Sequence, residues 1–311
     1  MENFNQNSPL VSIVVITYNS DKYIIETLQS IFDQTYENIE LIISDDGSKD
    51  ETITVCKKWL DNFHVRFVRA ELITTAQNSG TAGNLNRGIS AAKGIWIKPI
   101  AGDDALFPDV IKNYISYIKK ENKILCIHSN SIEYEENFQE KNRLPNKDAS
   151  KYKINSSNID SDMQFEILLR CCPVGTPTAM YHKSVFQQVG NYDERFPLWE
   201  DRPMFLKMTL NGIKLHYLDI DGAKYRVRND SVVRFKNKNM VSRFKKDRSE
   251  ALEVLFLNHL NGIERSLNVA LIKLNIFFYK KGNNSSLLKV IYNVLTYPLQ
   301  YFLSKINNRY R

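Results

Sequence analysis

Two adjacent carboxylates, Asp103 and Asp104, follow an apolar run in the segment AGDDALFP. Neighbouring carboxylates repel each other unless a cation joins them. A hard divalent ion with oxygen ligands would relieve the repulsion and bridge a diphosphate, and it would act as a Lewis acid on the departing phosphate. The pair therefore predicts a Mn²⁺ or Mg²⁺ site, although the same residues could instead cap the helix that Pro108 opens.

Two further polar loops have residue types that suit a nucleoside. The first is ITYNS, which contains Tyr18, and the second is DDGS, which contains Asp45 and Asp46. A carboxylate can accept the imide hydrogen of uracil while an aromatic ring stacks on the base, so Asp46 and Tyr18 are candidates for these two contacts. The alternative for DDGS alone is local turn chemistry, which favours Asp, Gly and Ser.

A fourth acidic site lies in WEDRP, where Glu200 and Asp201 precede the stretch MFLKMTL. Acidic residues at a helix start interact favourably with the helix dipole, and that is one explanation for them. The other is catalytic, because an acceptor hydroxyl loses its proton as a new bond forms and a nearby carboxylate can take it.

The elements that position these residues alternate regularly. Apolar, β-branched runs predict strands at residues 11–16, 39–43, 64–69 and 95–100, and helical spacing predicts helices at 22–34, 50–60, 81–92 and 108–120. Strand and helix in turn are typical of a largely parallel sheet covered by helices. Ligands bind beyond the carboxyl ends of such strands, so the loops after Ile16, Ile43 and Ile100 should meet.

The second half of the chain is less regular. Residues 135–162 are polar and lack periodicity, which indicates a long loop that serves either as an acceptor-side flap or as a solvated insertion. A helix is expected at 162–170, strands at 213–218 and 223–227, and helices after residue 231. We found no internal repeat.

The net charge of +7 is unevenly distributed: residues 223–311 hold 18 Lys and Arg against 5 Asp and Glu. Such a basic part suits an anionic surface, either nucleic acid or lipid headgroups. The four cysteines form no CxxC or Cys/His pattern of a zinc site and are expected to be reduced. No leader or membrane span is evident, so we expect neither secretion nor membrane insertion.

The last segment, residues 285–311, combines Leu, Ile, Tyr and Phe with basic residues and contains no acid. This composition is typical of a helix that lies in a membrane interface, with a kink or break at Pro298. The alternative is an ordinary helix packed on the preceding domain.

In their order and spacing, these motifs resemble family 2 glycosyltransferases, which are inverting enzymes with the GT-A fold. The resemblance covers most of residues 10–231. It rests on the following segments, in chain order: VSIVVITYNSDKYIIETLQSIFDQTYENIELIISDDGSKDET, NSGTAGNLNRGISAAKG, AGDDALFPD and FQQVGNYDERFPLWEDRPMFLKM.

The resemblance implies a role for each motif. It places Thr17, Tyr18 and Asp46 on the nucleoside, with Asp45 beside them. It makes Asp103 the metal ligand of the DxD motif, with Asp104 close by. It also makes Asp201 the catalytic base of the ED motif with Glu200 as its neighbour, and it puts Arg228 near the diphosphate.

The chain departs from the family pattern at three places. Ala101 replaces the first aspartate of D-x-D-D, which leaves fewer carboxylates for a metal. Leu85 stands where an arginine is common, with Arg87 two residues on. Lys98 is unusual in an apolar strand, where it could contact the donor phosphates or extend to the rim of the sheet.

We therefore predict an α/β GT-A domain at residues 9–232 and a basic helical extension at 233–311. The resemblance implies transfer from a UDP-sugar, with Mn²⁺ or Mg²⁺, to a saccharide on a polyprenyl diphosphate used in bacterial surface polysaccharide assembly. The expected location is cytoplasmic and peripheral, at the anionic inner face of the membrane.

Two alternatives remain at this stage. The first is a degenerate member that binds the donor without transferring sugar, which Ala101 suggests. The second is a nucleic-acid-binding protein that uses the basic tail. No known nucleic-acid-binding motif appears, and we expect no nucleic-acid partner.

Overall fold

The computed structural model describes residues 8–121, 123–145, 148–228, 246–280, 286–307 and 310. Its centre is an eight-stranded sheet with the strand order β3-β2-β1-β4-β7-β6-β8-β5. The strands are β1 (Val11–Thr17), β2 (Ile39–Asp45), β3 (Arg69–Thr74), β4 (Trp96–Ala101), β5 (Ala105–Leu106), β6 (Cys126–Glu135), β7 (Met180–His182) and β8 (Leu215–Val227).

The sheet has a parallel half and a mixed half. Strand β1 lies between β2 and β4 and pairs with both in parallel, and β3 pairs in parallel with β2. Strand β7 runs antiparallel to both β4 and β6, whereas β6 and β8 pair in parallel. The short β5 is joined to β8 through Ala105 and Leu106, so the loop after β4 is tied to a strand that comes much later in the chain.

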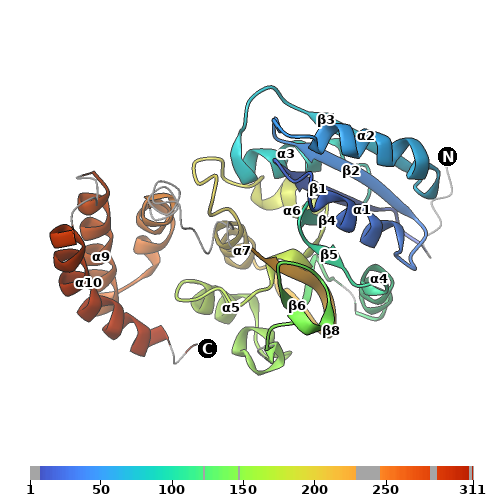
Figure 1. The fold of residues 1–311 in the computed structure, drawn as a ribbon. Coiled ribbons are helices and arrows are strands. Elements are labelled where there is room, and N and C mark those ends of the chain that lie inside the picture. Colours follow the sequence, from blue (N-terminus) through green and yellow to red (C-terminus); the bar gives the residue numbers. More distant parts are fainter. Residues whose placement is uncertain are drawn as a thin grey trace.

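Helices cover both faces of the sheet (Figure 1). One apolar cluster joins the sheet to α1, α2 and α4, and the other joins it to α3, α5, α6 and α7. Alternation along β1 explains the division, because Val14 contributes to one cluster and Ile13 and Val15 to the other. The helices are α1 (Ile24–Phe32), α2 (Thr52–Phe63), α3 (Gly80–Ala91), α4 (Val110–Lys120), α5 (Ser161–Leu168), α6 (Ser184–Val189) and α7 (Asp201–Leu210).

The C-terminal part is helical. Residues 246–251 form a helix that continues through a π-helical turn at Leu252–Phe256, and α9 (Gly262–Lys280) and α10 (Ser286–Asn307) then pack on each other (Figure 1). The Phe256 ring stacks on Trp199 with centroids 5.6 Å apart, which joins this part to the domain. None of the helices within the described residues is both long and apolar enough to cross a membrane.

Some predicted elements differ from the structure. The strand predicted at residues 64–69 is wrong: His64–Arg66 is a 3₁₀ turn, and the strand begins at Arg69 because Val65 and Val68 face solvent. Strand β6 lies within a stretch for which no strand was predicted, and the two strands expected at 213–218 and 223–227 form one continuous β8. The polar region after β6 contains three short 3₁₀ turns, at Glu140–Asn142, Ala149–Lys151 and Lys153–Asn155.

Candidate active site

The carboxyl ends of the parallel strands meet at one edge of the sheet, as expected. The register places Thr17 beside Asp45 and Ile16 beside Ala101, so the loops after β1, β2 and β4 leave the sheet side by side. The residues of the first three polar motifs are thereby gathered at this edge.

Thr17 and Tyr18 end β1 and begin its loop. The Thr17 side chain is buried, and its hydroxyl has no hydrogen-bond partner within the described residues. A Cβ atom on Gly102 would lie 3.0 Å from that hydroxyl, so the glycine leaves room between the two loops. The Tyr18 ring is 46% exposed and can receive a stacked base.

Asp45 stabilises its own turn. Its carboxylate accepts hydrogen bonds from the backbone N–H groups of Gly47 at 3.0 Å and Ser48 at 2.9 Å, and from the Ser48 hydroxyl. Gly47 has a φ of +78°, which a residue with a side chain rarely adopts. These contacts match the turn-forming alternative for Asp45, and they hold the chain so that Asp46 points the other way.

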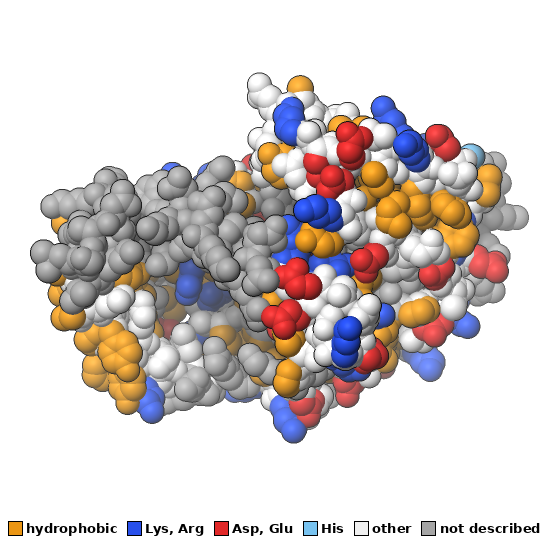
Figure 2. All heavy atoms as spheres, in the orientation of Figure 1, with side chains coloured by type: hydrophobic (Ala, Val, Ile, Leu, Met, Phe, Trp, Pro, Cys, Tyr) orange, Lys and Arg blue, Asp and Glu red, His pale blue; other side chains and the backbone are white. Residues whose placement is uncertain are grey.

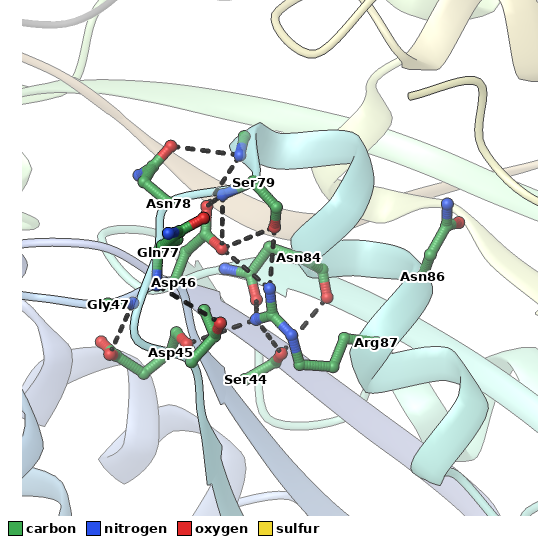
Figure 3. Close-up of polar contacts among 12 residues, drawn as sticks. Ser44, Asp45, Asp46, Gly47, Gln77, Asn78, Ser79, Asn84, Asn86 and Arg87 are labelled. Carbon is green, nitrogen blue, oxygen red and sulfur yellow. Dashed lines mark hydrogen bonds and ion pairs between the residues drawn. The ribbon is translucent and has the colours of Figure 1, made fainter. Parts of the chain in front are cut away.

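Asp46 joins the DDGS loop to the start of α3 (Figure 3). Its carboxylate accepts hydrogen bonds from the backbone of Ser79 and Gly80, from the Ser79 hydroxyl and from Arg87 Nη2, which lies 2.9 Å away. Burial alone would raise the pKa of Asp46, but these hydrogen bonds outweigh it and the pKa is lowered. The Ser79 hydroxyl contributes most to this lowering and Arg87 contributes next, so the arginine that contacts the carboxylate is Arg87, whereas Leu85 is buried in the core.

Asp103 lies among arginines. Its carboxylate is 3.0 Å from Arg228 Nη1, and its backbone carbonyl accepts a hydrogen bond from Arg226 Nε at 2.7 Å. The guanidinium groups of Arg228 and Arg226 lie 4.4 and 4.9 Å from the centre of the Tyr23 ring. The Asp103 side chain is 27% exposed and Arg228 is 16% exposed, so both are accessible to an incoming phosphate.

Asp104 faces the interior. It accepts a hydrogen bond from the backbone N–H of Arg226 at 2.9 Å and is almost fully buried. Burial and then the neighbouring Asp103 raise the pKa of Asp104 well above its ordinary value. Asp104 therefore supports the loop, and Asp103 is the carboxylate of the pair that is exposed to a ligand.

A divalent ion fits this loop in a restricted way. Within the described residues there is no group of three His, Cys, Asp or Glu side chains that could enclose a metal. Asp103 offers one accessible carboxylate, and Mg²⁺ commonly binds through one or two carboxylates together with substrate phosphates and water. The residues present therefore suit an ion that the protein and a diphosphate hold jointly.

Asp201 begins α7 on the other side of the candidate site. Its carboxylate accepts a hydrogen bond from the Thr176 hydroxyl at 2.8 Å and another from the Arg202 backbone N–H at 2.6 Å. Thr176 belongs to a 3₁₀ turn, Thr176–Thr178, that precedes β7. These two hydrogen bonds, one to each carboxylate oxygen, fix the orientation of the carboxylate.

Glu200 differs in its protonation. Burial and then the neighbouring Asp201 raise the pKa of Glu200 from 4.5 to about 8. Glu200 is therefore mainly protonated at neutral pH and cannot accept a further proton. Of the two acids in the motif, Asp201 is therefore the better candidate for a proton acceptor.

This difference predicts a pH-dependent stability. Between pH 4.5 and about 8, Glu200 is protonated in the folded protein but ionised in the unfolded chain. The free energy of unfolding therefore decreases as the pH rises through this range, because the unfolded state binds fewer protons. Glu200→Gln stays neutral and removes that loss. We expect the variant to be more stable than the wild type at pH 8 by about 1–3 kcal/mol, because one pKa unit corresponds to about 1.4 kcal/mol and partial exposure screens part of it. The advantage should be smallest near pH 4.5.

Urea unfolding at pH 5 and pH 8 measures the difference, with the exposed Glu37→Gln as the matched control. Equal effects of Glu200→Gln at the two pH values would show that the carboxyl titrates normally.

The pKa of Tyr225, on β8, is affected by acidic residues of both loops. Burial raises the pKa of Tyr225, and the charges of Asp104, Asp103 and, more weakly, Asp201 raise it further. The phenol therefore lies within electrostatic reach of both the Asp103 loop and Asp201.

Sequence reasoning missed three residues of this region: Tyr23, Thr176 and Arg226. Tyr23 counted only as an apolar position of the predicted helix at 22–34, Thr176 lies in the loop CCPVGTPTAM, and Arg226 lies in a strand. Only YRVRNDS, which drew attention to Arg228, gave a nearby signal.

Comparison with known proteins identifies the family and the fold. The family model described as glycosyl transferase family 2 matches residues 12–190, more than half of the chain. A glycosyltransferase of Rickettsia prowazekii, RP339, is 30% identical over 65% of this chain and 59% of its own length. GlyG of Streptococcus pneumoniae is 34% identical over 42% of this chain and 41% of its own length. The matched region thus spans about three fifths or less of these two relatives.

Solved structures show the same fold. TarS 1–349 of S. aureus, solved in complex with UDP-GlcNAc, has a TM-score of 0.58 at 16% identity, with 97% of this chain and 89% of that chain covered. The mannosyltransferase PcManGT of Pyrobaculum calidifontis, in complex with GDP-Man and Mn²⁺, has a TM-score of 0.57 at 14% identity, with 97% and 88% covered. The domain has the GT-A fold, and the chain belongs to glycosyl transferase family 2.

Proposed function

We propose that the protein is an inverting glycosyltransferase that moves a sugar from a UDP-sugar to an acceptor hydroxyl. The observations that best support this are the pairing of Asp103 with Arg228 and the orientation of Asp201 by Thr176. One group is suited to a diphosphate and the other to a proton. A transferase needs both.

The reaction is a single displacement. The acceptor oxygen attacks the anomeric carbon, its proton passes to the Asp201 carboxylate, and the bond between that carbon and the diphosphate oxygen breaks. Attack from the side opposite the leaving group inverts the anomeric centre. General-base help of this kind contributes about 10²- to 10⁴-fold in rate.

The leaving diphosphate carries the developing charge. Arg228, placed by its ion pair with Asp103 and its contact with the Tyr23 ring, supplies positive charge for it. Mn²⁺ or Mg²⁺ held by Asp103 and the phosphates would add Lewis-acid stabilisation of the same charge. The buried Asp104 holds the loop in place through its hydrogen bond with the Arg226 backbone N–H.

The nucleoside occupies the edge formed by Thr17, Tyr18 and Asp46. Tyr18 stacks on the base, and Thr17, whose buried hydroxyl has no hydrogen-bond partner within the described residues, forms the end of β1 beside it. Asp46 accepts hydrogen bonds from Ser79, Gly80 and Arg87, and these contacts fix the orientation of its carboxylate. The uracil imide would donate to the same carboxylate. Asp45 acts beside it by shaping the turn.

The acceptor we propose is a saccharide on a polyprenyl diphosphate used in surface polysaccharide assembly, reached at the anionic inner face of the membrane. The catalytic domain then comprises residues 9–232 and the extension 233–311, a boundary that lies outside the described residues. Support comes from α10, whose apolar side chains remain exposed over much of one face (Figure 2). They are Ile291, Val294, Leu295, Tyr297, Tyr301 and Phe302.

A screen of nucleotide-sugars tests the proposed activity. Binding and hydrolysis of UDP-GlcNAc, UDP-Glc, UDP-Gal and GDP-Man are measured with Mn²⁺, with Mg²⁺ and with a chelator. We expect one UDP-sugar to be bound and slowly hydrolysed in the presence of metal. Binding without hydrolysis or transfer to any tested acceptor would indicate a degenerate, non-catalytic member instead.

The exposed face of α10 gives a prediction about membranes. The double variant Tyr297→Ser and Phe302→Ser removes two rings that are 69% and 57% exposed, whereas neighbouring Leu303 is buried and stays. We expect co-sedimentation with vesicles containing anionic phosphatidylglycerol to fall at least 10-fold, because apolar insertion is lost while the basic residues remain. UDP binding and the melting temperature should be unchanged.

The matched control replaces two other exposed apolar residues, Val65→Ser and Val68→Ser, which lie between α2 and β3. This control should bind vesicles like the wild type, and higher salt should weaken the binding of both. Unchanged vesicle binding by the α10 variant would mean that α10 is an ordinary packed helix.

A further inference from the structure

Lys98 lies in the middle of the sheet and is not used by the proposed reaction. It belongs to β4, between β1 and β7, and its side chain is fully buried. Its Nζ donates hydrogen bonds to the backbone carbonyls of Pro99 at 2.8 Å and Pro177 at 2.6 Å. Lys98 therefore neither extends to the rim nor points at a donor phosphate.

The position of β7 explains why a side chain can reach Pro177. Strand β7 pairs with β4 at Trp96 and Ile97, and the chain before β7 forms the 3₁₀ turn Thr176–Thr178 beside the rest of β4. The Lys98 ammonium joins β4 to this turn where the strand pairing has ended. Here a side-chain hydrogen bond connects β4 to the neighbouring segment, whereas backbone hydrogen bonds connect the strands elsewhere in the sheet.

The same turn carries the hydroxyl that holds Asp201. Thr176 Oγ1 donates to Asp201, and the adjacent Pro177 carbonyl accepts from Lys98. The other end is fixed by Thr178, whose carbonyl accepts from the Tyr114 hydroxyl at 2.9 Å and whose Oγ1 accepts from the Ser129 backbone N–H at 3.0 Å. Lys98 is therefore one of several contacts that hold this turn, and it acts on the residue next to Thr176.

Stability alone does not account for a lysine at this place. Desolvating an ammonium costs several kcal/mol, and replacing a buried charge by an apolar residue of similar volume is often neutral or stabilising. Burial lowers the pKa of Lys98 to about 7, which reflects that cost. An apolar side chain would fill the space but could not bind the Pro177 carbonyl.

We propose that Lys98 is a positioning residue that sets the orientation of the Asp201 carboxylate by holding the Thr176–Thr178 turn through the Pro177 carbonyl. The inference rests on the proposed function in one respect, the role of Asp201 as base. Lys98 would then act on the acceptor side of the site, although its strand, β4, leads to the Asp103 loop.

The test compares Lys98→Met with a matched control. Methionine has a similar length and is apolar, so it removes the two hydrogen bonds without leaving a large cavity. Lys183→Met is the control, because Lys183 also donates to a buried backbone carbonyl, that of Ala92 at 2.7 Å, but does not touch the turn. Thr176→Val, the double variant with Lys98→Met, and Asp201→Asn complete the series.

Hydrogen exchange in the free chain reports on the turn directly. The amides of Thr178 and Ala179 donate to Gly175 and Thr176 within it. We expect their exchange to be at least 10-fold faster in Lys98→Met and unchanged in Lys183→Met. Unchanged exchange in Lys98→Met, in a chain that melts like the wild type, would overturn the proposal. Global acceleration would also count against it, because the lysine would then be a general stabiliser of the fold.

Turnover tests the link to Asp201, measured as UDP release from UDP-GlcNAc or from whichever UDP-sugar the wild type hydrolyses. We expect kcat to fall about 10- to 100-fold in Lys98→Met with UDP affinity unchanged, since small misplacements of a catalytic group have effects of this size. Thr176→Val should have a similar effect, and the double variant should be no worse than about 2-fold below the single variants. Multiplicative losses would mean that Lys98 acts by another route.

Asp201→Asn separates the two hypotheses. If it retains normal turnover, the assignment of the base fails, while the exchange data still decide whether Lys98 holds the turn. If Asp201→Asn is inactive and Lys98→Met has normal kcat, the inference about Lys98 alone fails.

Discussion

Asp201→Asn is expected to lower kcat by about 10²- to 10⁴-fold, the size of effect typical when a general base is lost. The amide oxygen can still accept the hydrogen bond from the Arg202 backbone N–H, and the amide NH2 can donate to the Thr176 hydroxyl, so the orientation of the side chain should persist. Proton acceptance is lost, and UDP affinity should hardly change because the residue lies on the acceptor side. Turnover of the donor identified by the screen, together with calorimetry of UDP binding, measures both quantities.

Asp162→Asn, at an exposed position in α5, serves as the control for this prediction and should be fully active. Normal kcat in Asp201→Asn, or a loss confined to UDP binding, would transfer the role to another group. Glu200 is a poor substitute, because its raised pKa keeps it protonated at neutral pH.

Asp103→Ala is expected to abolish transfer and the metal-dependent part of UDP binding. The loop offers one accessible carboxylate for an ion, so its removal leaves no replacement in Asp104, which is buried beneath Arg226. Arg228 remains beside the Tyr23 ring after its ion pair with Asp103 is lost, so binding without metal should persist. Calorimetry of UDP with Mn²⁺ and with excess chelator distinguishes the two components.

Asp109→Ala, six residues further on and exposed, is the matched control and should behave like the wild type. If the wild type transferred sugar at full rate in excess chelator, no metal would be required and Asp103 would serve only to place Arg228.

The sequence was sufficient for the parallel half of the sheet. Strands β1, β2 and β4 are apolar runs followed by polar loops, and that pattern alone places Thr17, Asp45 and Asp103 at one edge. It failed at residues 64–69, where the apolar Val65 and Val68 are exposed on a turn. Strand β6 was missed because CIHSNSIEYE mixes polar and apolar residues and gives no continuous apolar run.

The contacts that orient the site could not be read from the sequence. Thr176 is 25 residues from Asp201, and Arg226 is 122 residues from Asp104. Neither pair shares a motif, because these contacts depend on how the second half of the chain packs on the first. Lys98 was recognisable as unusual in its strand, but its carbonyl partner at Pro177 follows only from the tertiary structure.

The joining of β5 to β8 has a consequence for the order of folding. Strands β1 to β4 can assemble as the ribosome releases the first hundred residues, because their pairings are among neighbours in the chain. The loop that bears Asp103 and Asp104 meets its β8 partners only after Arg226 has been synthesised. Contacts between such distant segments form slowly. A nascent chain shorter than this should therefore hold a sheet with an unfinished catalytic loop, and activity should appear late in synthesis.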